Sequence, residues 1–383
     1  LFAAGQKGGP GMVTAYRAAR IVTMDPACTE VMDGAILIED GRIAAVVPWR
    51  EAAGTACRDL GPVTVVPGLI NAHAHLELSH LAGRVPGGRG FPAWADALFA
   101  AMRTHRAAPS DLAAALAAAH ASGTSFVADI VWREALSVRE ALAARDMGGH
   151  LFREMSGARA LPEMSPGDWP APWSVAVHAL YSTAPALARE AKAWCGSRGL
   201  PFSLHLAEVQ GENELLLGRG GDFADFVRSR RILPRGFVPP GMGAVAYAAD
   251  LGLLDERTLA VHCVHVDDAD MGILAQSGAS VCLCPRSNRR IGVGEAPAGA
   301  LHAAGVRLCL GTDSLASNDD LDLWAELRAV RGMLPAETTL RDLLAMVTSN
   351  PARILGIEGE YGSLVAGKRA AWAVLPPDFE GCP

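Results

Sequence analysis

From about residue 63 onward the chain alternates short apolar stretches with helical ones, and this alternation limits the possible folds more than any other feature. The apolar stretches, each a candidate strand, cover residues 64–72, 124–130, 150–155, 173–180, 201–207, 258–264, 279–285 and 306–312. Helical patterns lie between many of them, as at residues 110–121, 134–147 and 184–198. Strands that alternate with helices form parallel β/α units. Eight such units predict an α/β fold of the (β/α)8 TIM barrel type.

The two ends of the chain show strand patterns without long helices. Before residue 63, apolar runs flank the pair Asp40-Gly41, which is typical of a β-hairpin turn. Residues 362–368 and 370–375 return to strand character near the C-terminus. We therefore expect both ends to build one small sheet domain beside the barrel. Residues 1–11 are interpreted as a tag remnant or a loose native tail.

Charge and composition argue against several classes of partner. The net charge of -7 and the pI near 5.9 disfavour nucleic acid, which usually binds a basic face. No apolar run reaches the ~18 residues that span a bilayer, so we expect no membrane partner. The eight cysteines include no Cys-x-x-Cys pair and indicate no disulfide framework. These features predict a cytoplasmic enzyme with a small-molecule substrate; a homodimer is the assembly under consideration.

Candidate ligating side chains fall at the ends of the predicted strands. They are His73 and His75 on the first strand, His178 on the fourth, His205 on the fifth, His262 on the sixth and Asp313 on the eighth. Side chains two residues apart on a strand project from the same face, so the pair His73 and His75 can share one ion. Barrel enzymes place their active sites at the C-terminal strand ends. The six side chains are therefore expected to meet at one site.

Three imidazoles and one carboxylate suit a zinc-like divalent ion, with iron(II) as the alternative. The ion would lower the pKa of a bound water toward ~7. Glu208 lies three residues after His205, where it can take the water's proton and pass it to the leaving group. The alternative for Glu208 is a helix-opening carboxylate. His262 is expected to hydrogen-bond the attacking water or the developing oxyanion, with His265 as its competitor.

Five motifs give the chain a resemblance to a known superfamily. They are residues 67–75, 205–208, 262–265, 284–288 and 311–318. With them the chain resembles the amidohydrolase superfamily, in the branch that holds cytosine, guanine and S-adenosylhomocysteine deaminases and the triazine hydrolases. The resemblance implies one metal ion held by His73, His75, His205 and Asp313, with Glu208, His262 and Asp313 catalytic. It also implies a composite β-sandwich domain, here residues 12–62 and 358–383, beside a barrel of residues 63–357.

The resemblance implies hydrolysis of a C–N bond in an aromatic heterocycle, with attack by metal-bound hydroxide and release of ammonia. Residues 76–79 and the pair Phe91 and Trp94 look closer to the aminofutalosine deaminases of menaquinone biosynthesis than to the S-adenosylhomocysteine group. We therefore expect a 6-aminopurine nucleoside-like substrate, with aminofutalosine as the leading candidate. S-adenosylhomocysteine, methylthioadenosine and adenosine come next.

Two residues are predicted to contact this substrate. His178 is one, with a packed strand-end histidine as the alternative. Glu77 is the other, with ion pairing to Arg84 or Arg89 as the alternative. The loop of residues 76–91 is rich in glycine and proline, and we expect it to form a cavity wall or a lid.

Other functions stay open from the sequence. The six metal and catalytic residues do not separate loss of ammonia from loss of chloride or opening of an amide ring. An amidohydrolase or chlorohydrolase that acts on a triazine or a cyclic amide is therefore the main alternative. A non-catalytic binding scaffold is a remote one, because such a protein would be expected to have lost one or more ligands.

Overall fold

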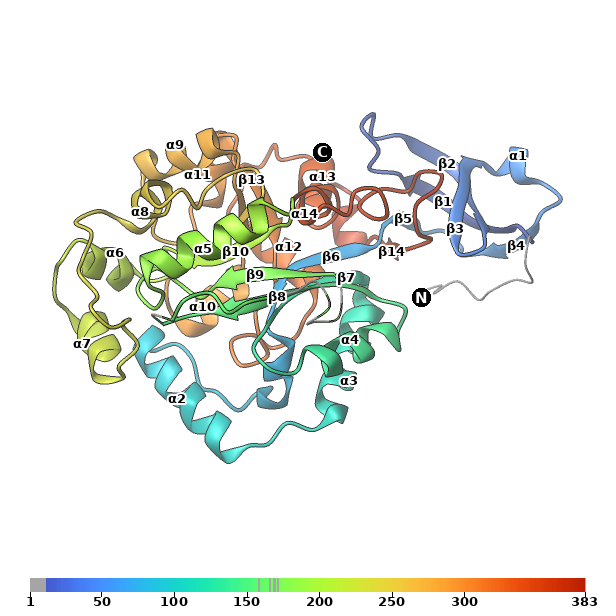
Figure 1. Cartoon of the computed structure of the whole chain (residues 1–383). Helices are drawn as coiled ribbons and strands as arrows, with labels where there is room; N and C mark the ends of the chain where they lie inside the picture. The colour runs from blue at the N-terminus through green and yellow to red at the C-terminus, as the bar shows by residue number, and fades with distance from the viewer. Residues whose placement is uncertain (1–11, 158, 165–166, 168–169, 171, 383) are drawn as a thin grey trace.

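The computed structural model describes residues 12–157, 159–164, 167, 170 and 172–382 of the 383-residue chain. Within this part the strands form two sheets, one of eight strands and one of six. Figure 1 shows the small sheet at one side of the molecule, with α6 (Gln210–Leu216) and α7 (Asp222–Ser229) at the opposite side.

The large sheet is a nearly closed parallel barrel. Its strands are β6 (Leu69–Ala74), β7 (Thr124–Val131), β8 (Gly148–Met155), β9 (Trp173–Val177), β10 (Phe202–Leu206), β11 (Thr258–His262), β12 (Ser280–Leu283) and β13 (Arg307–Leu310). Each pairs with the next in chain order, and an isolated parallel bridge between Ala74 and Asp313 joins the last strand to the first. Every residue of β7, β10 and β11 is buried, as expected for strands covered on both faces. The predicted barrel is confirmed.

The first predicted strand is in fact two strands. Residues 64–72 were expected to run as one, but β5 (Thr64–Pro67) pairs in the small sheet and β6 begins at Leu69. Gly68 separates them where the chain passes against β7. A Cβ at Gly68 would lie 2.5 Å from the Ser125 hydroxyl oxygen, so only glycine fits there. The small sheet therefore extends into the range 63–357 assigned to the barrel.

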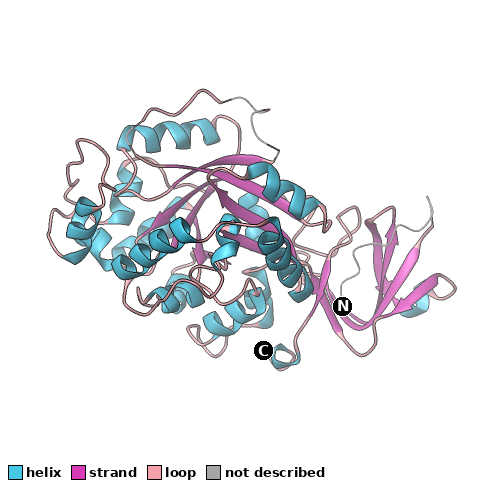
Figure 2. Ribbon diagram, turned by 90° about the horizontal axis from the view of Figure 1, so that it is seen from below, coloured by secondary structure: helices cyan, strands magenta, loops and turns pink. Residues whose placement is uncertain are grey.

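Helices surround the barrel, as Figure 2 shows. They include α2 (Phe91–Thr104), α3 (Pro109–Ser122), α4 (Ala135–Ala143), α5 (Pro185–Gly196), α9 (Asp268–Ser277), α11 (Ala298–Ala303), α12 (Leu323–Arg331), α13 (Leu340–Ala345) and α14 (Ser349–Leu355). Polar caps fix several starts: the Asp267 carboxylate accepts from the Asp270 N–H, and the Thr339 hydroxyl from the Asp342 N–H. None of the described helices is long and apolar enough to cross a membrane.

Shorter helices lie in the loops beyond the strand ends. They are η1 (Leu76–Leu81), α6, α7, α8 (Ala244–Asp250) and α10 (Pro285–Ile291). Three of these, α6 to α8, form an insertion between β10 and β11 that the strand and helix pattern did not predict. The loop of residues 76–91 is less open than expected, because the N–H groups of Gly88 and Gly90 donate to the carbonyls of Arg290 and Ile291.

The small sheet joins both ends of the chain, as predicted. It holds β1 (Thr14–Val22), β2 (Glu30–Glu39), β3 (Arg42–Pro48), β4 (Ala56–Asp59), β5 and β14 (Trp372–Val374), with α1 (Trp49–Ala52) beside it. The β2–β3 hairpin turns at Asp40 and Gly41, which both have positive φ as a type I′ turn requires. The C-terminal strand β14 pairs antiparallel with β5, which leads directly into the barrel.

Candidate metal centre and active site

The first and last barrel strands meet at the predicted metal site. The His73 carbonyl accepts from the N–H groups of Thr312 and Asp313, and the Asn71 side-chain amide donates to the Thr312 hydroxyl at 2.7 Å. These bonds bring the two histidines of β6 to the aspartate after β13. The Nε2 atoms of His73 and His75 lie 3.7 and 3.5 Å from Asp313 Oδ1.

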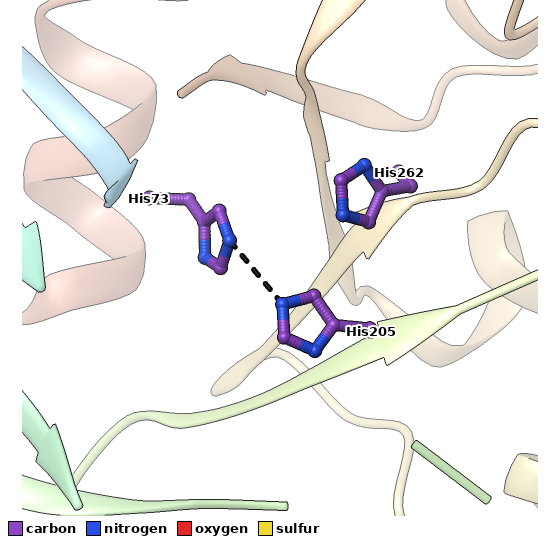
Figure 3. A group of neighbouring side chains, drawn as sticks. All are labelled: His73, His205 and His262. Carbon is purple, nitrogen blue, oxygen red and sulfur yellow. Dashed lines mark hydrogen bonds between the residues drawn. The ribbon is translucent and has the colours of Figure 1, made fainter. Parts of the chain in front are cut away.

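His205 lies one residue before the end of β10 and faces His73 across the barrel. Its Nδ1 lies 2.8 Å from the His178 carbonyl oxygen, which can only accept, so Nδ1 carries the proton and Nε2 is left with a lone pair. That Nε2 lies 3.3 Å from Nε2 of His73, as the dashed line in Figure 3 shows. Two ring nitrogens that face each other at this distance, one with its lone pair exposed, form a binding place for a cation.

Asp313 supplies the negative charge of the set. The backbone of Asp313 has a φ of 57°, and the side-chain oxygen Oδ2 accepts hydrogen bonds from Ser287 at 2.6 Å and Ser317 at 2.8 Å. Burial alone would raise the pKa of Asp313, but His75, His262 and the two serine hydroxyls outweigh it and hold that pKa below its usual value. The carboxylate is therefore ionised, with Oδ1 free to ligate.

The histidines have the protonation state that ligands need. Burial lowers the pKa of His73 well below its usual value, and it lowers the pKa of His75 to about 3 against the opposing effect of Asp313. Neutral imidazoles offer nitrogen lone pairs. The donor set of His73, His75, His205 and Asp313 therefore fits one divalent ion of the zinc type. Such an ion, when bound, supplies Lewis acidity and lowers the pKa of water.

Glu208 and His262 lie beside this donor set. The Glu208 Oε1 is 3.8 Å from His262 Nε2, and both side chains are buried. Burial raises the pKa of Glu208 to about 7, with Asp313 adding to the shift and His205 opposing it. A carboxyl group with this pKa can both accept and donate a proton near neutral pH. This arrangement is compatible with the general acid–base role predicted for Glu208.

His262 lies in a group with His73 and His205, as Figure 3 shows. His262 has a φ of 75°, and its Nδ1 lies 2.9 Å from the Asn288 side-chain oxygen, to which it donates. Its Nε2 therefore faces Glu208 with a lone pair. His265 instead bonds the Val293 carbonyl through Nε2 at 2.7 Å and lies away from the metal ligands.

The two predicted substrate contacts have different surroundings. His178 lines the cavity described next, and its Nδ1 lies 2.7 Å from the Ser182 hydroxyl. Glu77 does not lie among the cavity-lining residues. Its Oε1 accepts from the backbone N–H groups of Trp132, Arg133 and Glu134, at 3.2, 2.8 and 2.6 Å. Glu77 thus fixes the loop between β7 and α4, and this arrangement does not favour a substrate contact.

A cavity of about 410 Å³ opens onto the predicted metal ligands, and its size is typical of small-molecule sites. Its inner end holds His75, His205, Glu208, His262 and Asp313, and its outer walls are largely apolar. Phe91 and Trp94 of α2 contribute to these walls. Both are mostly buried, and the Trp94 indole N–H donates to the Ala316 carbonyl, so they act as core and as wall together.

Glu154, Trp132 and Arg231 are among the cavity residues that the sequence interpretation did not identify. Glu154 ends β8, Trp132 follows β7, and Arg231 follows α7. The strand-end rule that identified the histidines applies equally to Glu154. Glu154 was not identified, because the residues next to it in the sequence include no second candidate metal ligand and no known motif.

Glu212, on α6, is a buried carboxyl group behind Glu208. Its Oε2 accepts from the Glu208 N–H at 3.2 Å, and burial raises its pKa to about 8, with Glu208 adding to the shift. In the unfolded chain a glutamate titrates near ~4.3. Between these pH values the folded state holds a proton that the unfolded state has lost. The contribution of Glu212 to stability is therefore complete at low pH and is lost as the pH rises through 8.

We expect Glu212→Gln to change the pH dependence of stability. The variant should match the wild type at about pH 4 within about a degree and exceed its Tm at about pH 9 by several degrees, since roughly 2–4 °C corresponds to 1 kcal/mol in a large domain. Thermal unfolding at both pH values measures this. Glu214→Gln, on the same helix but near the surface, is the matched control. Parallel pH profiles for Glu212→Gln and wild type would contradict the assignment.

The fold and the site together define a class. A parallel barrel whose strand ends hold three histidines and an aspartate, with a glutamate and a fourth histidine beside them, is a metal-dependent hydrolase site. Comparison with known families agrees: the model of the amidohydrolase family matches residues 64–382. The chain belongs to the amidohydrolase family, and it is a hydrolase that acts on C–N bonds.

Curated relatives and solved structures extend the comparison. A 5-methylthioadenosine/S-adenosylhomocysteine deaminase of Nitratidesulfovibrio vulgaris is 31% identical over 92% of this chain and 81% of its own length. The aminofutalosine deaminase of Helicobacter pylori, solved with methylthio-coformycin, has a TM-score of 0.80 at 22% identity, over 95% of this chain and 91% of its own. An adenosine deaminase of Xanthomonas campestris with bound zinc has a TM-score of 0.77 at 23% identity, over 96% and 85%. The two solved structures show the fold.

Proposed function

We propose that the protein is a metal-dependent deaminase that removes the 6-amino group of an adenine nucleoside-like compound. The observation that carries the proposal is the buried Glu208, with a pKa of about 7, placed beside His262 and the four-ligand set at the inner end of the cavity. The 5-methylthioadenosine/S-adenosylhomocysteine deaminase that is 31% identical to this chain supports the substrate class, because both of its named substrates are adenosine derivatives.

Each residue of the site has its own role in the proposed reaction. His73, His75, His205 and Asp313 would hold a zinc ion, or iron(II) in its place. Glu208 takes the proton from the attacking water and delivers it to the ring and then to the leaving amine. His262 Nε2, which carries a lone pair, accepts a hydrogen bond from the attacking water and orients it. Water supplies the oxygen of the product. One of its protons goes to the ring nitrogen, and the other goes to the amino group, which leaves as ammonia.

The cavity suits a nucleoside better than a free base. Its outer part adds apolar walls from α2 and α7, together with Trp132, beyond the space that a purine ring next to Glu208 would fill. Trp132 has 37% of its surface exposed, and its ring lies 6.1 Å from that of His75, within reach of a flat ligand. His178 stays the proposed contact for the substrate ring.

Among particular substrates, aminofutalosine remains the leading candidate because of residues 76–79, and methylthioadenosine and S-adenosylhomocysteine follow. Values of kcat/KM across these compounds, adenosine, free adenine, guanine, cytosine and a chlorinated triazine would test the proposal. We expect each adenine nucleoside to exceed free adenine by ~10²-fold or more, because binding of the remote sugar contributes to transition-state stabilisation. A preference for a free base or for the triazine would overturn the nucleoside assignment and leave the metal hydrolase in place.

A further inference from the structure

Glu154 is a cavity residue that the reaction described above does not use. It lies at the end of β8, between the ends of β7 and β9, and 7% of its side chain is exposed. One carboxylate oxygen, Oε2, accepts from the Trp132 indole N–H. The other, Oε1, has no hydrogen-bond partner among the described residues.

Among the described residues, the histidines nearest to Glu154 are His178 and His205, and neither donates a hydrogen bond to Oε1. The imidazole Nδ1 of His205 is 4.0 Å away, beyond hydrogen-bond range, and its proton is already donated to the His178 carbonyl. A buried carboxylate oxygen without a donor is unfavourable, and native structures rarely keep one unless a ligand or water supplies the donor. Because Glu154 lines the cavity, a bound ligand can supply the missing N–H or O–H.

Two successive sets of hydrogen bonds, here called the relay, hold Glu154 in position. Glu77 accepts three backbone N–H groups of the loop that carries Trp132, and the Trp132 indole in turn donates to Glu154. Each contact fixes the next one. The relay commits Oε2 to the protein and leaves Oε1 for a ligand.

We propose that Glu154 accepts hydrogen bonds from the sugar hydroxyl groups of the substrate, and that Glu77 and Trp132 are its positioning residues. The proposal rests on the proposed function. An adenine nucleoside carries donors only on its 6-amino group and its sugar. The amino group leaves at Glu208, and methylthioadenosine and S-adenosylhomocysteine carry sulfur in place of the 5′-hydroxyl of adenosine. The sugar donors that these candidate substrates share are therefore the 2′- and 3′-hydroxyls. A carboxylate is the usual acceptor for a ribose hydroxyl in proteins.

The test measures each of several enzyme variants on each of several substrates that lack one hydroxyl group. We would measure kcat and KM for adenosine, 2′-deoxyadenosine and 3′-deoxyadenosine with wild type, Glu154→Gln and the control Glu140→Gln, whose site is exposed on α4. The wild type and the control should lose roughly 10- to 100-fold in kcat/KM when the bonded hydroxyl is removed. In Glu154→Gln the Trp132 indole N–H should hold the amide oxygen, so that an NH2 group replaces the acceptor Oε1. This variant should therefore lose a similar factor on adenosine and discriminate poorly among the three substrates.

A second variant tests the relay itself. Trp132→Phe keeps an aromatic wall but removes the indole donor, so it should raise KM for adenosine and weaken the hydroxyl discrimination while metal content stays unchanged. Glu77→Gln should act in the same direction with a smaller effect, because its amide oxygen still accepts N–H groups. A purely structural role would lower kcat and stability without any effect on the discrimination between hydroxyls.

The outcomes separate this inference from the proposed function. Full hydroxyl discrimination in Glu154→Gln, or loss of its metal ion, would overturn the inference while deamination of adenosine upheld the function. If no adenine nucleoside is turned over, the proposed function fails. Calorimetric Kd values of the wild type for the same three compounds then still decide the inference, and equal values would overturn it.

Discussion

His205→Ala should release the metal ion and abolish turnover. The His205 Nε2 faces His73 Nε2 at 3.3 Å, and its removal takes away the one ligand that β10 contributes. Loss of a residue that only supports a ligand weakens metal affinity by about 10- to 100-fold, and loss of the ligand itself should exceed that. Elemental analysis should show about one equivalent of zinc or iron in the wild type and a small fraction in the variant.

His302→Ala is the matched control, because this histidine lies on α11 outside the cluster. It should keep the metal and the activity. Full metal occupancy in His205→Ala would refute the ligand assignment. Loss of metal with the fold retained, seen as an unchanged circular dichroism spectrum, would separate ligation from a general loss of structure.

Glu208→Gln should keep the metal and the fold but lose most of its turnover. The amide has the shape of the carboxyl group but cannot accept and return a proton, and general acid–base catalysis contributes ~10²- to 10⁴-fold. The measurement is kcat on the best adenine nucleoside, together with metal content. Glu214→Gln, on the helix that follows Glu208, should retain activity. A near-normal kcat in Glu208→Gln would show that this residue only supports the start of α6.

The sequence allowed the barrel and its ligands to be predicted because both follow local rules. Buried parallel strands appear as short apolar runs, and their C-terminal ends converge whatever the loops do. His73, His205 and Asp313 could therefore be placed together although more than 100 residues separate each from the next. The insertion of α6 to α8 was missed, because its helices are short and no strand separates them.

Glu77 and Glu154 could not be interpreted in this way. The partners of Glu77 are backbone N–H groups more than 50 residues further along the chain, and backbone donors leave no mark in a sequence. Glu154 becomes informative only when its two oxygens are compared, one bonded to Trp132 and one unpaired. Such a difference depends on tertiary packing and not on a motif.

The contact between β6 and β13 has a consequence for folding. Most neighbouring barrel strands share a ladder of several residue pairs, whereas an isolated bridge between Ala74 and Asp313 and a few bonds nearby join the first strand to the last. Two proposed ligands lie on one side of this seam and Asp313 on the other. An ion bound there would hold the first strand and the segment after the last strand together. Its binding free energy would then be thermodynamically linked to closure of the barrel. Metal availability would then govern how much of the protein population is folded, and through that its lifetime in the cell.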